Sequence, residues 1–411
     1  MNFIKIRAVD FCKSITDGTH DSPKRTKTGK PLVTSKHLSR YGIDFDSTYL
    51  ISESDYKKVI ARSRVDKWDV LYSMIGTIGN IYIETSNNTE YACKNVGIFK
   101  MGGAEYKSKW LYYYLQTRAA QEYILGVSRG TTQGYVPLGA LRELQIPITD
   151  SYTMNRITSV LWEIDEKIKN NRAINHNLQQ QIQALFSAWF CTFEPFGGTV
   201  PSNWSTRNLS EIAEFVGGYA YKGNELMKST TVMATIKNFE RTGGFKLDGF
   251  KEIRPSNKLK STQRLALYDI LVAHTDLTQN AEVIGNAEMV MSLLDYHDAI
   301  FSMDLVKVVP KPGCLSQFLL AALLQNRVFK AHCLGYVNGT TVLHLSKKAL
   351  PEYKLLLPND LSVLSPLDKA ITALYLQISA NIEENSRLEL LRETLLPQLM
   401  SGEIDVSNIK L

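Results

Sequence analysis

The strongest constraint on the fold is a long apolar seam that occurs twice in the 411 residues. Apolar residues recur at intervals of three and four over residues 154–190, which predicts a coiled-coil helix rather than a helix lying on a broad core. Two Asn residues interrupt the seam, and polar residues at such positions fix helix register at a cost in stability. The seam positions are Met154, Ile157, Leu161, Ile164, Ile168, Asn171, Asn175, Leu178, Ile182, Leu185 and Trp189.

The second seam lies near the C-terminus and also has two Asn residues at its centre. Ser365-Pro366 precedes it, a pair that suits the start of a helix. We expect the two helices to pair with each other as a spacer of roughly 55 Å. The alternative is that each is an amphipathic helix packed on a separate core. The second seam consists of Leu367, Ile371, Leu374, Ile378, Asn381, Asn385, Leu388, Arg392, Leu395 and Leu399.

The chain also contains an internal repeat. Residues 115–141 and 324–350 align without a gap and share ten of 27 positions, and residues 34–42 resemble residues 235–243. Such duplication predicts two globular heads, each followed by a long helix. Two copies of one unit most simply pack about a pseudo-twofold axis, which makes the helices antiparallel. The expected divisions are residues 1–150 (first head), 151–194 (first helix), 195–361 (second head) and 362–411 (second helix and tail).

Each head is expected to be mixed α/β. Runs of β-branched and apolar residues predict strands, and longer apolar segments predict helices. The expected strands cover residues 70–75, 96–99, 270–273 and 305–309, and the expected helices cover residues 109–123 and 316–332.

Basic charge is concentrated at equivalent places in the two heads. The net charge is only +6, but residues 24–64 hold ten Lys and Arg against four Asp and Glu, and residues 222–264 hold the same numbers. Two matched patches favour a polyanion held at two points. The alternative is an ordinary solvated surface, which is common for a single patch.

Particular residues in these patches suit contact with nucleic acid. Lys24, Arg25 and Lys27 form a basic loop for phosphates. Lys36-His37 and Lys237-Asn238 each place a cation beside a residue able to read base edges, and two Gly-Thr-Thr turns suit a close approach to a backbone. The full set of expected contacts is Thr19, His20, Lys24, Arg25, Lys27, Lys36, His37, Arg40, Lys58, Arg64, Thr131, Thr132, Tyr221, Lys222, Lys237, Asn238, Arg241, Lys258, Arg264, Thr340 and Thr341.

Residues for catalysis are not evident. The sequence has no Gly-rich phosphate loop ending in Gly-Lys-Ser/Thr and no Asn-Pro-Pro-aromatic motif for a flipped adenine. The run Asp165-Glu166-Lys167 is interpreted as solvated charge on the outward face of the first long helix. Five Cys residues without ordered spacing predict no metal site and no catalytic site. With no apolar run of membrane length and no signal-like N-terminus, the expected compartment is the cytoplasm.

Over nearly its whole length the chain resembles the DNA-specificity subunits of type I restriction-modification systems. The ordered motifs that carry this resemblance are Asp17-Gly18-Thr19-His20, Arg62-Ser63-Arg64-Val65, Gly130-Thr131-Thr132, Leu144-Gln145-Ile146-Pro147, Leu185-Phe186-Ser187-Ala188-Trp189-Phe190 and Leu395-Leu396-Pro397-Gln398-Leu399-Met400-Ser401-Gly402. The second head departs from the pattern, because Thr275-Asp276-Leu277-Thr278 replaces the turn Gly76-Thr77-Ile78-Gly79.

The resemblance implies that the heads are two target-recognition domains, each reading half of a bipartite double-stranded DNA site. It also implies that the helices bind two methyltransferase subunits, to which translocase-nuclease (restriction) subunits can be added. The chain itself would hold no cofactor, with S-adenosylmethionine and ATP bound by those partners. Two alternatives are a coiled-coil scaffold with two binding heads and, disfavoured by the missing motifs, a fused methyltransferase or nuclease.

Overall fold

The structure, a computed structural model, divides into two compact units. The first comprises residues 1–169 with 388–411, and the second comprises residues 170–387. Each unit therefore combines one head with parts of both long helices, and the expected mixed α/β fold is confirmed. No helix in the described part of the chain combines the length and the apolar character needed to span a bilayer. The described residues are 3–130, 134–241, 243–276, 278, 280–340 and 342–406.

The first head is built on an antiparallel sheet in the order β2-β10-β7-β8 and a second sheet in the order β6-β3-β9. A separate pair, β1 with β11, joins the start of the head to its end. Its strands are β1 (Ile4–Arg7), β2 (Ser14–Asp17), β3 (Lys30–Thr34), β4 (Leu38–Ser39), β5 (Gly42–Ile43), β6 (Tyr49–Ile51), β7 (Val70–Ser73), β8 (Ile81–Ile83), β9 (Ala92–Lys94), β10 (Val96–Lys100) and β11 (Gln145–Ile148). Its helices are α1 (Ala8–Phe11), the 3-10 turn η1 (Ser35–His37), α2 (Glu53–Ser63), α3 (Glu105–Tyr114), α4 (Arg118–Val127) and α5 (Leu138–Glu143).

The second head repeats the two larger sheets and the terminal strand pair of the first head. Its main sheet has the order β13-β20-β16-β18, its second sheet the order β15-β14-β19, and β12 pairs with β23 at the ends. Its strands are β12 (Trp204–Asn208), β13 (Ala213–Gly217), β14 (Thr231–Ala234), β15 (Lys251–Glu252), β16 (Ile270–Ala273), β17 (Thr275–Asp276), β18 (Ala287–Met289), β19 (Asp298–Phe301), β20 (Leu305–Pro310), β21 (Val337–Asn338), β22 (Leu343–Leu345) and β23 (Lys354–Pro358). Its helices are η2 (Glu194–Phe196), α7 (Leu209–Ile212), η3 (Gly223–Glu225), η4 (Ile236–Asn238), η5 (Leu247–Gly249), η6 (Ser261–Gln263), α8 (Gln317–Leu324), α9 (Arg327–Leu334) and η7 (Leu361–Leu364).

Glycine is required at one repeated backbone crossing. After β2, a Cβ added to Gly18 would lie 2.3 Å from the carbonyl oxygen of Cys93, and after β13 a Cβ on Gly218 would lie 2.0 Å from that of Ser302. Only a residue without a side chain allows two backbones to approach this closely. The glycine after the first main-sheet strand is thus part of the repeated fold.

The helices expected over residues 109–123 and 316–332 are each broken in two. Thr117 accepts a hydrogen bond from the Ala120 amide and starts α4, and Asn326 accepts from the Val328 and Phe329 amides and starts α9. These side chains cap a new helix and satisfy its first free N–H groups. The prediction of single helices was wrong, because the repeated Leu-Gln-Thr/Asn-Arg motif is a helix break.

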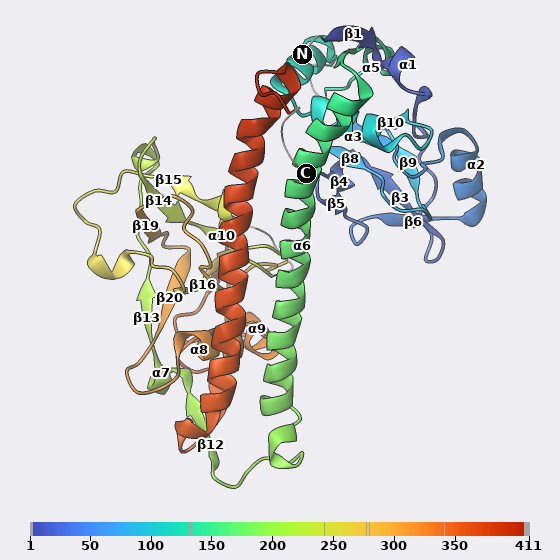
Figure 1. The fold of residues 1–411 in the computed structure, drawn as a ribbon. Helices are drawn as coiled ribbons and strands as arrows, with labels where there is room; N and C mark the ends of the chain where they lie inside the picture. The colour runs from blue at the N-terminus through green and yellow to red at the C-terminus, as the bar shows by residue number, and fades with distance from the viewer. Residues whose placement is uncertain are drawn as a thin grey trace. The chain divides into compact units, whose positions relative to one another are not determined.

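The two long helices are α6 (Ser151–Phe190), green in Figure 1, and α10 (Ser365–Ser401), red. In the second unit they are antiparallel: Asn171 Nδ2 donates to Asn385 Oδ1 over 2.9 Å, and Asn381 Nδ2 donates to Asn175 Oδ1 over 2.7 Å. Polar side chains of one seam therefore meet those of the other, as an antiparallel register predicts. In the first unit the helices meet at a buried ion pair between Asp165 and Arg392.

The core of each unit is continuous with its part of the helix pair. In the first unit, apolar side chains of α3 and α5 pack with residues of α6 and α10, and the second unit has an equivalent cluster. Buried apolar surface of this kind stabilises the head and the helices together. The seam residues Ile168, Asn171, Ile182, Ile378, Asn381 and Asn385 are buried, and Ile164, Asn175, Leu178, Leu374 and Leu388 are half-buried.

Candidate nucleic-acid interface

The first head has an open cavity of about 240 Å³ with two lysines at its edge. Lys36 projects from η1, whose start is fixed by Thr34, and Lys94 ends β9 beside Asn95. Small polar groups, backbone turns and two cations in one hollow are the groups that bind phosphate oxygens. The lining residues are Thr34, Ser35, Lys36, Ile75, Gly76, Thr77, Lys94 and Asn95.

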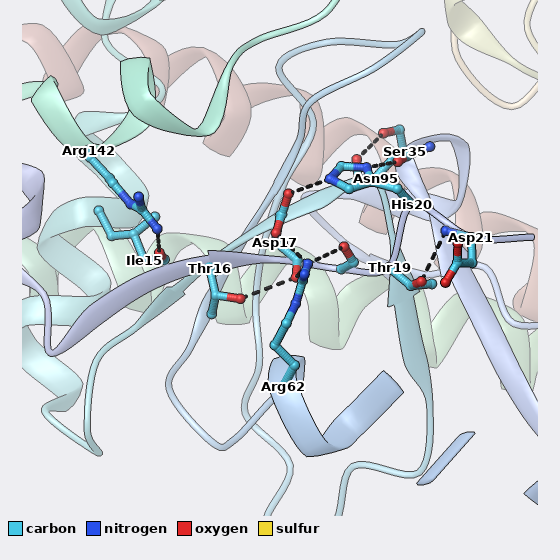
Figure 2. A network of polar contacts seen from close by, with 11 residues as sticks. Ile15, Thr16, Asp17, Thr19, His20, Asp21, Ser35, Arg62, Asn95 and Arg142 are labelled. Carbon is cyan, nitrogen blue, oxygen red and sulfur yellow. Dashed lines mark hydrogen bonds and ion pairs between the residues drawn. The ribbon is translucent and has the colours of Figure 1, made fainter. Parts of the chain in front are cut away.

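A polar network joins the loop after β2 to the rim of this cavity (Figure 2). His20 bonds through Nδ1 to Asn95 Oδ1 at 2.9 Å and through Nε2 to Asp17 Oδ2 at 2.8 Å. Arg62 Nη2 donates to the other oxygen of Asp17 over 2.8 Å. Asp17 is thus held between two basic side chains, and the imidazole of His20, mostly exposed, is fixed in direction. Both ring nitrogens of His20 are therefore engaged inside the network, which holds the loop after β2 in one conformation beside the cavity.

The side chains of His37 and Asn238, which were expected to read bases, are buried within their own turns. His37 Nδ1 accepts from the Thr34 amide over 2.9 Å, and Asn238 Oδ1 accepts from the Thr235 amide over 2.8 Å. Both side chains are buried, and burial lowers the pKa of His37 below its ordinary value. They close the turns η1 and η4 from inside, because a 3-10 turn needs its first amides capped. The neighbouring Lys36 and Lys237 are left exposed on the outer side of the two turns.

The other basic residues of the first head that were expected to contact nucleic acid lie on its surface, several in contact with neighbours. Arg25 stacks on the Tyr49 ring at 4.9 Å, Lys58 lies 3.8 Å from Asp55, and Arg64 lies 3.3 Å from Asp66. Exposed pairs of this kind are weak and exchange partners easily. Lys24, Lys27 and Arg40 are also exposed, Thr19 is half-buried, and Arg40 lines a smaller cavity of about 90 Å³ with Tyr82, Tyr112 and Trp162.

The basic residues of the second head lie at turns that correspond to those of the first head, but their ion pairs differ. Arg241 forms an ion pair with Glu282 at 3.0 Å, and Arg264 forms one with Asp298. Lys222 and Lys258 are exposed, and Tyr221 packs half-buried on a small cluster around Tyr219. Gly217 stands at the position of Asp17, so the described part of this head has no carboxylate there. Gln263 Nε2 instead donates to the carbonyls of Gly217 and Gly218, as Arg62 does to those of Asp17 and Gly18.

The Gly-Thr-Thr turns are only partly described. Thr340 is exposed, whereas Thr131, Thr132 and Thr341 lie outside the described residues. Lys94, Asn95 and Arg62 were absent from the expected contacts. The sequence did hold one signal for the first two, since Lys94-Asn95 is a polar pair between two apolar strands, where a short turn is expected.

The comparisons with known proteins agree with this geometry. The family described as type I restriction modification DNA specificity domain matches residues 5–180. The specificity subunit of the type I restriction enzyme MjaIX of Methanocaldococcus jannaschii is 23% identical, covering 92% of this chain and 88% of that protein. The specificity subunit of the type I restriction enzyme HindI of Haemophilus influenzae is 22% identical, covering 84% of this chain and 88% of that protein.

A solved structure shares the fold. The crystal structure of the S subunit of a type I restriction-modification system from M. genitalium superposes with a TM-score of 0.57 at 17% identity, covering 97% of this chain and 96% of that one. The repeated heads, the long helix pair, the family match and the two relatives agree with one another. The chain is thus similar over most of its length to type I restriction-modification specificity subunits, and residues 5–180 match their DNA specificity domain.

Proposed function

We propose that this chain is the sequence-specific DNA-binding subunit of a type I restriction-modification complex. Each head reads one half of a bipartite double-stranded target. The observation that carries the proposal is that Lys36 and Lys237 are exposed on equivalent capped turns of two heads with one topology. A rigid turn that holds a cation outward suits phosphate contact, and two such turns suit two half-sites.

The chemistry is assigned to partner subunits. We infer that two methyltransferase subunits bind to the helix pair and supply S-adenosylmethionine and methyl transfer to a flipped adenine. Restriction subunits would add ATP-dependent translocation and cleavage. The chain itself is proposed to be non-catalytic, so the purified protein should turn over neither S-adenosylmethionine nor ATP.

The salt dependence of DNA affinity tests the binding proposal. The logarithm of the association constant should fall steeply with the logarithm of salt concentration, because bound phosphates release counterions. The double variant Lys36→Ala/Lys237→Ala should bind more weakly, with a slope shallower by roughly one for each lost phosphate contact. Lys369→Ala, on the exposed face of α10, is the matched control. A parent protein with no salt dependence would support the scaffold alternative instead.

A further inference from the structure

Two bulky aromatic residues adopt a left-handed backbone conformation at equivalent places in the repeat. Trp68 has φ of 70°, and Tyr268 has φ of 71°. Each is the third residue of a tight turn before a central strand of the main sheet: the Asp69 amide donates to Asp66 O over 3.0 Å, and the Asp269 amide donates to the Ala266 carbonyl over 3.1 Å. At this position a turn with positive φ ordinarily has glycine.

The turn itself does not need an aromatic side chain. Its geometry is fixed by the following aspartate: Asp69 Oδ2 accepts from the Asp66 amide over 2.7 Å, and Asp269 Oδ2 accepts from the Ala266 amide over 2.8 Å. Positive φ costs a residue with a Cβ roughly 1–2 kcal/mol relative to glycine. A strained conformation persists where surrounding contacts over-determine it. The reason for the aromatic residue must therefore lie in what its ring contacts.

In the first unit the ring contacts the long helix α6. The Trp68 ring lies 6.2 Å from the ring of Trp162 in an edge-on arrangement, and Tyr112 of α3 packs on the same Trp162 at 6.3 Å. Lys109 Nζ lies over both indoles, 5.4 Å from Trp68 and 4.5 Å from Trp162. Edge-on aromatic pairs and cation–π contacts add specific orientation to apolar burial.

In the second unit the equivalent ring reaches the other long helix, α10. The Tyr268 ring lies 5.0 Å from Phe318, which in turn packs on Tyr375 of α10 at 6.0 Å. The Tyr268 hydroxyl donates to Ser379 Oγ of α10 over 3.4 Å, and Gln317 donates to the Tyr268 carbonyl. The same strained turn position thus joins a head to a long helix in both units, with different side chains.

We propose that Trp68 and Tyr268 are positioning residues that anchor each DNA-reading head in one orientation on the long helices. Relaxing either anchor would let that head turn on its helix. The protein would then accept half-sites at spacings that it normally rejects. This role rests on the proposed function, because spacing has meaning only for a chain that reads two half-sites.

Three variants at Trp68 and one at Tyr268, all made in the full chain, separate anchoring from simple stabilisation. Trp68→Ala keeps the strained φ and loses the ring, whereas Trp68→Gly loses the ring and relieves the strain. Unfolding in denaturant should therefore show a higher midpoint for Trp68→Gly than for Trp68→Ala. Trp68→Tyr introduces the residue type that the second head has at the equivalent position, and this variant should behave like the parent. Tyr268→Phe, which keeps the ring and loses only the bond to Ser379, is the milder variant in the second head.

Binding is then measured on duplexes that differ only in half-site spacing. Selection from a randomised double-stranded DNA library defines the parent target, and duplexes with one base pair added or removed between half-sites test spacing. We expect the parent to prefer one spacing at least tenfold and both ring-deleting variants to lose most of this preference. Recovery of stability and spacing preference together in Trp68→Gly would overturn the proposal, because stabilisation alone would then explain the residue.

A second readout does not depend on DNA. Hydrogen exchange of the α6 amides around Trp162 should accelerate in Trp68→Gly and remain at the parent rate in Trp68→Tyr. Unchanged exchange in Trp68→Gly contradicts the anchor even if DNA binding is intact. A parent that selects no sequence from the library contradicts the proposed function, while accelerated exchange would still support the contact between head and helix.

Discussion

The Arg392 side chain of α10 is only 2% exposed, and its Nη1 donates to Asp165 Oδ1 over 2.6 Å. Tyr113 of α3 donates to the other oxygen of Asp165 over 2.8 Å. The Asp165 carboxylate therefore binds both α3 and α10. The expectation that Asp165 is a solvated charge on the outward face was wrong, because its partner lies 227 residues away in the sequence. A buried ion pair is costly to form but more costly to break on one side.

Removing one partner of this pair is expected to destabilise the first unit strongly. Asp165→Ala leaves the buried guanidinium uncompensated, at a cost of about 3–5 kcal/mol in the free energy of unfolding. Denaturant unfolding followed by fluorescence measures it. Arg118→Ala, which breaks an exposed pair with Glu122, is the control and should change stability by less than about 1 kcal/mol. Equal effects for the two variants would show that Arg392 finds another partner.

Glu288 on β18 predicts a pH dependence for the second unit. Its carboxylate accepts from the Gly244 amide over 2.7 Å and from Gln325 over 3.2 Å, and it faces Glu240 and Lys330. Burial raises the pKa of Glu288 to about 7. The folded state therefore binds this proton more tightly than the unfolded chain does. Its stabilising effect is complete below the unfolded pKa and is lost as pH rises through about 7.

Stability of the second unit should consequently fall between about pH 4.5 and 7, with a slope of up to about 1.4 kcal/mol per pH unit from this group. Glu288→Gln should flatten that slope, since the amide can still accept from Gly244 and does not ionise. Urea unfolding at a series of pH values tests this. If both proteins show the same slope, another group titrates in that range.

At the scale of elements, the sequence was informative wherever periodicity determines structure. The seams follow from the spacing of apolar residues, and central strands such as β7 and β16 follow from short runs of apolar and β-branched residues. The breaks at Thr117 and Asn326 did not, because a cap depends on one side chain meeting amides two or three residues later. The positions of His37 and Asn238 did not follow from the sequence either. A His or Asn beside a Lys is typical of a base contact, but here both side chains close their own turns. Lys94 joins the cavity of Lys36 only through the parallel pairing of β3 with β9.

The repeated glycine crossing gives a prediction at this scale. Gly18→Ala and Gly218→Ala should each destabilise their own unit by about 1–3 kcal/mol, because the added Cβ meets a backbone oxygen that cannot move independently. Thermal unfolding measures the shift. Gly139→Ala in α5, where a Cβ meets nothing within 4 Å, should be neutral or slightly stabilising. Tolerance of Ala at both crossings would mean that the strands separate easily there.

For the whole molecule, the duplication predicts that half of the chain can assemble with itself. A fragment ending near Phe196 retains the first head and all of α6, but lacks the α10 residues that complete the core of the first unit. The α6 helix of a second copy offers a similar seam, including Asn171 and Asn175. We expect this fragment to dimerise and, with the proposed methyltransferase partner, to modify a palindrome of the first half-site.

Sedimentation and mapping of the modified sites check the expectation. Trp189 would meet a different neighbour in the self-pair than in the full chain. A fragment that is only monomeric at tens of micromolar, or a modified site that is not palindromic, would contradict the pseudo-twofold argument.

The division of both long helices between the units has a consequence for synthesis on the ribosome. The core of the first unit includes Leu396, Leu399, Met400 and Val406, which follow the whole second unit in the chain. The second unit, residues 170–387, is complete before them. At about 5–20 residues per second, the first head waits on the order of 10–50 s for the segment that covers it. The first head is therefore expected to fold after the second unit although it is translated before it, and a ribosome that stalls before residue 388 would leave that head open to proteases and chaperones.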